Sequence, residues 1–207
     1  MKGLILKDLL SLKKQGKLLL LMLVFFVVYS YATKNTSILG SMLAVLCTML
    51  PITTLSCDER SKWDKFALST PVQRKTVVVS KYVLSILFNI TAFAIMTVIN
   101  LILLPYTENA NLEETVLTLL GTCMGTLLIL AIFMPFLFKF GVEKSRFILM
   151  AIYALPLMIS GLIHKMNIPL PDERFLKSLA YASPVITLCL LLISVNVSVG
   201  IYNKKEF

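Results

Sequence analysis

The segment at residues 57–80, CDERSKWDKFALSTPVQRKTVVVS, lies between two long apolar stretches, and this alternation decides the fold. A charged segment between apolar stretches of about 20 residues is a loop between two membrane spans. The charged side chains of this loop need contact with water, whereas Trp63, Phe66 and Leu68 need to be shielded from water by other protein surfaces. A loop that combines charge with aromatic residues is typical of a docking surface for a soluble partner.

The composition of the whole chain fits this interpretation. Of its 207 residues, 57% are hydrophobic and 15% are charged, whereas soluble proteins carry about 25% charged residues. Backbone groups inside a bilayer must pair within the protein, and apolar runs of this length pair as helices. The sequence therefore predicts an all-α membrane protein with a single transmembrane domain, residues 1–207. Its six predicted spans are 18–32, 38–56, 77–104, 115–138, 147–163 and 184–202.

The net charge of +9 is unevenly distributed along the chain. With the N-terminus inside, every lysine and arginine falls in a cytoplasmic segment except Lys34, Lys165, Arg174 and Lys177. The positive-inside rule therefore predicts that both termini and the loop at residues 57–80 are cytoplasmic. Because topology accounts for the basic charge, no nucleic-acid partner is expected.

Residues 1–16 precede the first span and are amphipathic. On a helical wheel the apolar residues share one arc and the polar residues share the opposite arc, which predicts an interfacial helix on the anionic inner leaflet. The apolar set is Ile5, Leu6, Leu9, Leu10 and Leu12, and the polar set is Lys7, Asp8, Ser11 and Lys14.

The central loop contains two helix-start signals. Ser56 and Glu59 match a capping box, which predicts a short helix over residues 57–68 with Trp63 and Phe66 on one apolar stripe. We interpret Trp63 and Phe66 as interface anchors within a polar rim, although a Trp in the headgroup belt is the alternative.

The second helix start lies at Thr70 and Pro71, before Arg74. The third span is therefore predicted to begin near Pro71 and to project from the membrane as a stalk.

Later in the chain, residues 139–146 are predicted to form a second cytoplasmic loop that contains Gly141. Residues 172–181 are predicted to form a short external helix, and Ser183-Pro184 is predicted to restart the last span.

Catalytic signatures are missing from the sequence. It contains no GxxxxGK[ST] phosphate-binding loop, one histidine (His164), and no paired cysteines with metal-ligand spacing. No charged residue falls in the middle of a predicted span, which disfavours an ion-coupled carrier. We therefore expect neither a catalytic residue, nor a metal site, nor a cofactor bound by this chain.

Polar uncharged residues do occur inside the predicted spans. Asn89, Thr97 and Asn100 lie near one helical face, and Asn196 lies in the last span. Two interpretations are equally supported: these residues line a pathway, or they form interhelical hydrogen bonds.

The motifs of the central loop resemble those of the small ABC-2-type permeases, and especially the permease subunits of bacterial phenol-soluble modulin and other peptide exporters. The resemblance rests on the residues Glu59, Trp63, Leu68-Ser69-Thr70-Pro71, Arg74-Lys75 and Ser80-Lys81-Tyr82.

The resemblance implies a type V-like ABC exporter in the bacterial plasma membrane. Two permease subunits, identical or closely related, would flank the path of an amphipathic peptide or similar hydrophobic molecule. Each would dock on a separate ATPase subunit that binds ATP and Mg. The resemblance assigns ATPase coupling to Asp58, Glu59, Arg60, Trp63, Phe66 and Leu68, and the start of the stalk to Thr70, Pro71 and Arg74.

Two alternative functions belong to other classes of membrane protein, and the first class has a similar length and span number. One is the substrate-binding membrane subunit of a vitamin importer, which has little need for a charged, Trp-bearing inner loop. The other is an immunity or sensor protein that binds a peptide without an ATPase.

Overall fold

The computed structural model describes residues 2–13, 16–33, 36–63, 66–67, 73–103, 112–166 and 173–205. No strand occurs in these ranges, so the described part of the chain is all-α, as the sequence predicts. The principal helices are α1 (Lys2–Lys13), α2 (Gly16–Thr33), α3 (Thr36–Ser61), α5 (Arg74–Leu103), α6 (Leu112–Lys165) and α7 (Glu173–Asn203).

Five helices of the described residues, α2, α3, α5, α6 and α7, are long and apolar enough to cross a membrane. Their positions follow the hydropathy of the sequence. The predicted spans 18–32 and 38–56 lie inside α2 and α3, and the predicted span 77–104 overlaps α5. The chain therefore has the apolar helices of a multi-pass membrane protein.

The longest helix, α6, contains two predicted spans, 115–138 and 147–163, and is folded at Gly141. Gly141 has φ 77° and ψ 179°, which residues with a Cβ rarely adopt. The loop predicted over residues 139–146 is therefore wrong, because this one non-helical residue reverses the chain. We call residues 112–140 the first arm, residues 142–165 the second arm, and the reversal the elbow.

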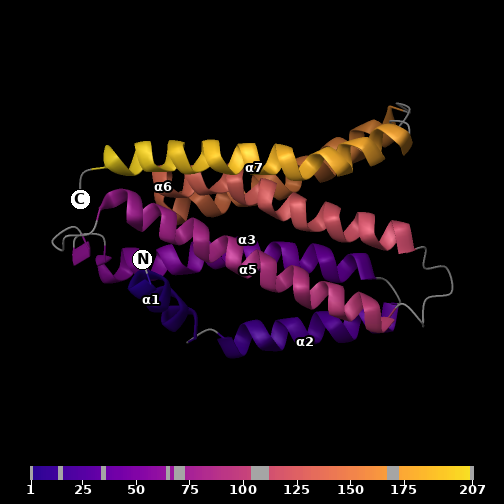
Figure 1. The fold of residues 1–207 in the computed structure, drawn as a ribbon, viewed down its shortest axis with the longest axis horizontal. Helices are drawn as coiled ribbons and strands as arrows, with labels where there is room; N and C mark the ends of the chain where they lie inside the picture. The colour runs from indigo at the N-terminus through magenta and orange to yellow at the C-terminus, as the bar shows by residue number, and fades with distance from the viewer. Residues whose placement is uncertain are drawn as a thin grey trace.

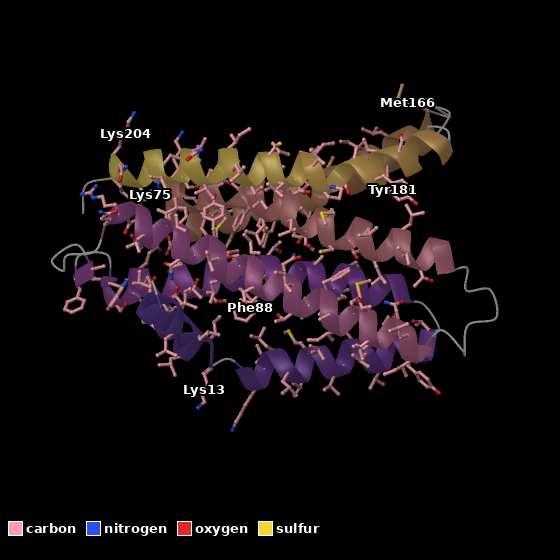
Figure 2. All side chains as sticks on the ribbon, in the orientation of Figure 1. Lys13, Lys75, Phe88, Met166, Tyr181 and Lys204 are labelled. Atoms are coloured by element: carbon pink, nitrogen blue, oxygen red, sulfur yellow. The ribbon has the colours of Figure 1, made fainter. Side chains whose placement is uncertain are left out.

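The elbow defines one end of the molecule. Figure 1 shows that α6 doubles back, so that both of its ends lie at the end opposite the elbow. Helix α1, the start of α5 and the C-terminal end of α7 gather at the elbow end (Figure 1). In Figure 2, Lys75 and Lys204 mark the elbow end, and Met166 and Tyr181 mark the far end.

Helix α7 also differs from the sequence prediction. The restart predicted at Pro184 is wrong, because α7 continues through Pro184 without a break. A proline has no N–H for the carbonyl four residues earlier, here that of Ala180. The hydroxyl of Ser183 donates to the Ala180 carbonyl at 2.7 Å, which satisfies this oxygen and lets the helix continue.

The main apolar core lies where α3, α5, α7 and both arms of α6 meet. Its fully buried side chains include Val78 of α5 and Phe133, Met134 and Leu137 of the first arm. Tyr82 of α5 lies in this core and is 2% exposed, and its hydroxyl needs polar partners there.

Three helices supply the polar partners around Tyr82. Pro135 leaves the Ala131 carbonyl of the first arm without its helical donor. The hydroxyl of Ser194, on α7, donates to this carbonyl at 2.5 Å. The Tyr82 hydroxyl lies 2.6 Å from Ser194 Oγ and 2.8 Å from Ser198 Oγ.

Proton counting gives this chain of hydroxyls one direction. Ser194 has a single hydroxyl proton, and the Ala131 carbonyl can only accept. Tyr82 must therefore donate to Ser194, and Ser198 must donate to Tyr82. One continuous chain of hydrogen bonds between buried side chains thus joins α5, α7 and the first arm.

The first prediction concerns the carbonyl freed by Pro135. We expect Ser194→Ala to lower the free energy of unfolding by about 1–3 kcal/mol, because the Ala131 carbonyl is left buried and unpaired. Adding Pro135→Ala restores a backbone N–H, so the double variant should lose less than the sum of the single variants. Unfolding in detergent measures these energies. Ser198→Ala is the control that Pro135→Ala should not rescue, and additive losses would contradict the assignment.

Candidate functional site

Four charged side chains from three helices meet at the elbow end, and we call them the charge cluster. They are Lys7 and Asp8 of α1, Asp58 of α3 and Lys81 of α5. Asp58 Oδ1 lies 2.5 Å from Lys7 Nζ, and Asp58 Oδ2 lies 2.6 Å from Lys81 Nζ. Asp8 Oδ1 lies 2.8 Å from Lys81 Nζ and 3.1 Å from Lys7 Nζ. Each lysine therefore contacts both carboxylates, and the cluster as a whole is neutral.

The charge cluster is deeply buried. The side chains of Asp8, Lys81 and Asp58 are 1%, 4% and 8% exposed, and only Lys7 reaches the rim at 24%. Removing a single ion from water costs several kcal/mol, so each of these charges depends on its partners. Asp8 Oδ2 is buried and has no hydrogen-bond partner among the described residues.

Helix α1 brings its polar face to this cluster. The sequence predicts an interfacial helix whose lysines face the anionic leaflet, but Asp8 is buried and Lys7 turns towards α3. Leu12 is buried with Leu50 and Leu84 in a small apolar core. The exposed side chains of α1 include the apolar residues Leu6, Leu9 and Leu10, together with Lys13 at its C-terminal end. The amphipathic pattern is present, but its charged side binds the protein.

Glu59 follows Asp58 and contacts a different element. The predicted start of a short helix after Ser56 is wrong, because α3 runs without a break from Thr36 to Ser61. Glu59 Oε1 accepts a hydrogen bond from the backbone N–H of Val142 at 3.1 Å. Val142 is the first residue of the second arm, so Glu59 caps the arm on the far side of the elbow.

The aromatic pair, Trp63 and Phe66, lies just beyond α3. Lys62 has φ 51° and redirects the chain where α3 ends. The rings of Trp63 and Phe66 have centroids 5.3 Å apart, and Lys7 Nζ lies 4.3 Å from the centre of the Trp63 ring. Trp63 is half-buried, and Phe66 is 59% exposed. Trp63 Nε1 is buried without a hydrogen-bond partner in the described part of the chain.

The residues to which the family resemblance assigns ATPase coupling therefore separate into those that contact other helices of the protein and those that are exposed at the elbow end. Asp58 is buried in the charge cluster, whereas Glu59 is exposed but caps the second arm. Arg60 and Phe66 are exposed at the elbow end. Leu68 lies outside the described residues.

The predicted stalk is described from Gln73 onward, so Thr70 and Pro71 lie outside the described residues. Helix α5 begins at Arg74, and the guanidinium of Arg74 binds the C-terminal end of α7. Arg74 Nη1 donates to the carbonyls of Tyr202, Asn203 and Lys205 at 3.3, 2.8 and 3.0 Å. Arg74 thus caps the negative end of α7 and links it to the base of α5.

The predicted pathway residues have different environments. Asn89 is buried and donates to Thr126 Oγ of the first arm at 2.5 Å. Thr97 and Asn100 donate to carbonyls of their own helix, those of Phe93 and Met96. Asn196 is exposed on α7, at the height where Tyr82 contacts Ser194 and Ser198. The structure therefore gives Asn89 an interhelical bond and does not bring the four residues together.

A small cavity of about 20 Å³ lies beside Asn89 and is lined mostly by α3, α5 and the first arm. A water molecule needs about 10–15 Å³ of such volume, so this cavity can hold one water but no organic substrate. Gly40 lines the cavity, and a Cβ at Gly40 would lie 2.5 Å from the terminal methyl of Met96. The described residues contain no group of three or more His, Cys, Asp or Glu side chains that could hold a metal ion.

Sequence reasoning did not find the structural roles of Lys7, Asp8, Lys81 and Val142. One usable signal was present: the single charge of Lys81 among apolar residues near the start of α5 needs an opposite charge nearby. The contact of Val142 uses its backbone N–H, for which the side chain gives no signal.

The second prediction concerns the buried charges. We expect Lys81→Met to lower the free energy of unfolding by about 3–5 kcal/mol, because both carboxylates lose a buried partner. Lys75→Met, at an exposed position of the same helix, is the control and should change it by less than about 0.5 kcal/mol.

The double variant Asp58→Asn with Lys81→Met leaves the Lys7–Asp8 pair and no excess charge. It should therefore be more stable than the sum of its single variants predicts. Equal losses for Lys81→Met and Lys75→Met in detergent unfolding would show that the cluster does not stabilise the fold.

Residues 3–203 match the model of the family described as ABC-2 family transporter protein, which covers the described helices from α1 to α7. No curated protein and no solved structure matches the chain. The match agrees with the apolar helices of the fold and with the resemblance of the central loop to ABC-2-type permeases. The chain therefore belongs to the ABC-2 transporter family, as a membrane permease component and not an ATPase.

Proposed function

We propose that the chain is the permease subunit of an ABC exporter that moves amphipathic peptides or other hydrophobic molecules out of the cell. A separate ATPase subunit would bind ATP and Mg and supply the energy, and a second permease subunit would complete the path. The permease role follows from the family match, which favours it over a vitamin-importer subunit and over an immunity protein. Export and the peptide substrate rest on the resemblance of the central loop.

In this proposal the two arms of α6 are separate spans, which gives six crossings. A straight helix of 54 residues would be about 80 Å long, more than twice the thickness of the bilayer core. The elbow end would lie in the cytoplasm of a bacterial cell. Support comes from the positive-inside rule, because exposed basic residues gather at the elbow end. They are Arg60, Lys62, Lys75, Lys139, Lys144, Arg146 and Lys204.

The ATPase would dock on the aromatic pair at the elbow end. Phe66 is more than half exposed, and an exposed aromatic ring surrounded by charged residues is typical of an interface anchor. Arg60 and Lys62 are exposed beside the pair and would form its polar rim.

The observation that carries the proposal is the position of the aromatic pair at the end of α3. The last turns of α3 bind α1 and α5 through Asp58, and bind the elbow through Glu59. A displacement of the aromatic pair by an ATPase would therefore act on four helices at once. Such an arrangement suits a protein that converts motion at its surface into motion of its spans.

The substrate path is proposed to lie between two permease subunits. The cavity beside Asn89 holds no more than a water molecule, so this cavity does not provide the path. Long exposed apolar surfaces on α2, on the second arm and on α7 are available to contact lipid and a second subunit.

The third prediction tests docking. We expect Phe66→Ala to reduce co-purification of the ATPase about 30-fold in affinity, because losing an interface anchor costs about 2 kcal/mol or more. Tyr181→Ala is the control, because Tyr181 is 65% exposed but lies at the far end (Figure 2). Binding is measured with the purified permease in detergent. If both variants retained the ATPase equally, the aromatic pair would not be part of the interface.

The fourth prediction tests the orientation. A membrane-impermeant thiol reagent applied to intact cells should label Tyr181→Cys and should leave Lys204→Cys unlabelled. The four native cysteines are replaced first, since Cys189 is exposed on α7. Labelling of Lys204→Cys in intact cells, with Tyr181→Cys protected, would reverse the proposed topology.

A further inference from the structure

Helix α3 and the second arm of α6 are joined at two points, 11 positions apart on each helix. At the elbow, Glu59 Oε1 accepts from the N–H of Val142 at 3.1 Å. Deeper in the bundle, Thr48 Oγ lies 2.8 Å from the hydroxyl of Tyr153. The spacing is the same on both helices, from Thr48 to Glu59 and from Val142 to Tyr153. At 1.5 Å per residue the two contacts are about 16 Å apart, so the two helices run antiparallel and in register.

The two arms of α6 are joined close to the elbow, where the hydroxyl of Ser145 donates to the carbonyl of Phe136 at 3.2 Å, and this contact lies within five residues of Gly141. Gly141 is the only residue within α6 that has non-helical backbone angles. A Cβ placed at Gly141 would lie 3.1 Å from Glu59 Oε1, so the carboxylate occupies the space beside the glycine. Glycine is thus required by its positive φ and by the approach of Glu59.

Glu59 contributes charge as well as a hydrogen bond. The carboxylate lies at the positive end of the second arm, where a negative charge is favoured. Glu143 is also acidic and lies one residue further along, but it is exposed and belongs to the arm itself. Glu59 brings its charge to this helix terminus from a different helix, α3.

We propose that Glu59 is a positioning residue that makes α3 and the second arm one rigid pair, which turns against the first arm at Gly141 when the ATPase binds ATP. This role rests on the proposed function. It differs from the role that the sequence assigns to Glu59, namely a contact with the ATPase. The ATPase would displace the aromatic pair, and the hydrogen bond between Glu59 and Val142 would transmit this displacement to the second arm.

The cap is tested first without the ATPase. In the purified permease, hydrogen exchange of peptides covering residues 141–146 should be about tenfold faster in Glu59→Ala than in wild type, since a charge-assisted hydrogen bond is lost. Glu59→Gln keeps an acceptor oxygen and should show an intermediate rate. Glu143→Ala, the matched control at the elbow, should exchange like wild type. An unchanged exchange rate in Glu59→Ala would show that Glu59 does not cap the second arm, and it would overturn the proposal.

The coupling is tested in the complex with the ATPase. Spin labels replace Val116 on the first arm and Met158 on the second arm, which are 53% and 68% exposed. The native cysteines are replaced, and labelled subunits are diluted with unlabelled ones. A non-hydrolysable ATP analogue should change the distance between labels by about 2 Å or more in wild type and in Glu143→Ala. The change should be largely lost in Glu59→Ala and partly restored in Glu59→Gln.

The outcomes separate this inference from the proposed function. Glu59→Ala should keep the ATPase bound, unlike Phe66→Ala. Loss of the ATPase from Glu59→Ala would make Glu59 a docking contact and overturn the inference while leaving the proposed function intact. A full distance change in Glu59→Ala would also overturn it. If no ATPase binds wild type, the proposed function fails and the coupling role fails with it, whatever the exchange rates show.

Discussion

The pairing of Asp58 with two lysines is the interaction on which the elbow end of this protein depends. Asp58 binds Lys7 of α1 through one oxygen and Lys81 of α5 through the other. Because three of the four charges are less than a tenth exposed, none of the helices that carry them can move away alone without leaving a buried charge unpaired. The electrostatics therefore fix α1, α3 and α5 relative to one another at the end where the aromatic pair lies.

In the rest of the structure, uncharged polar groups also need partners when they are buried, although an unpaired one costs less than an unpaired charge. Inside a bilayer, every backbone carbonyl without a helical donor needs another partner. Prolines create such carbonyls in α6 and α7, and the hydroxyls of Ser194 and Ser183 satisfy two of them. One hydroxyl acts between helices and the other within its own helix. The Ser183 hydroxyl thus lets α7 continue through Pro184, and the carbonyl that Pro135 leaves without a helical donor gives α6 a bond to α7.

The part of the fold that depends on local composition could be predicted from the sequence. Hydropathy located the apolar segments, because a helix in lipid needs an uninterrupted run of apolar residues. The helix boundaries near Glu59 could not be predicted. Ser56 and Glu59 have the spacing of a capping box, but Glu59 instead accepts from Val142, which is 83 positions away in the chain. A local pattern cannot reveal such a partner.

The same limit applies to the site. The sequence singled out the segment that contains Asp58, Glu59, Trp63 and Phe66, because charge and aromatic residues are rare together in an apolar chain. It could not divide them into buried and exposed residues, since Asp58 finds its partners 51 positions before it and 23 positions after it. For Gly141, the sequence predicted a loop, because nothing local shows that one residue is enough to reverse a helix.

The burial of Lys81 also bears on how the chain is made. During synthesis the N-terminal parts emerge first, and both carboxylates that bind Lys81 belong to helices that precede α5. When α5 leaves the ribosome, the counter-ions for its lysine are already present in the chain. The ammonium group of Lys81 can therefore be paired as soon as α5 packs against α1 and α3, and the order of the helices along the chain is itself suited to assembly.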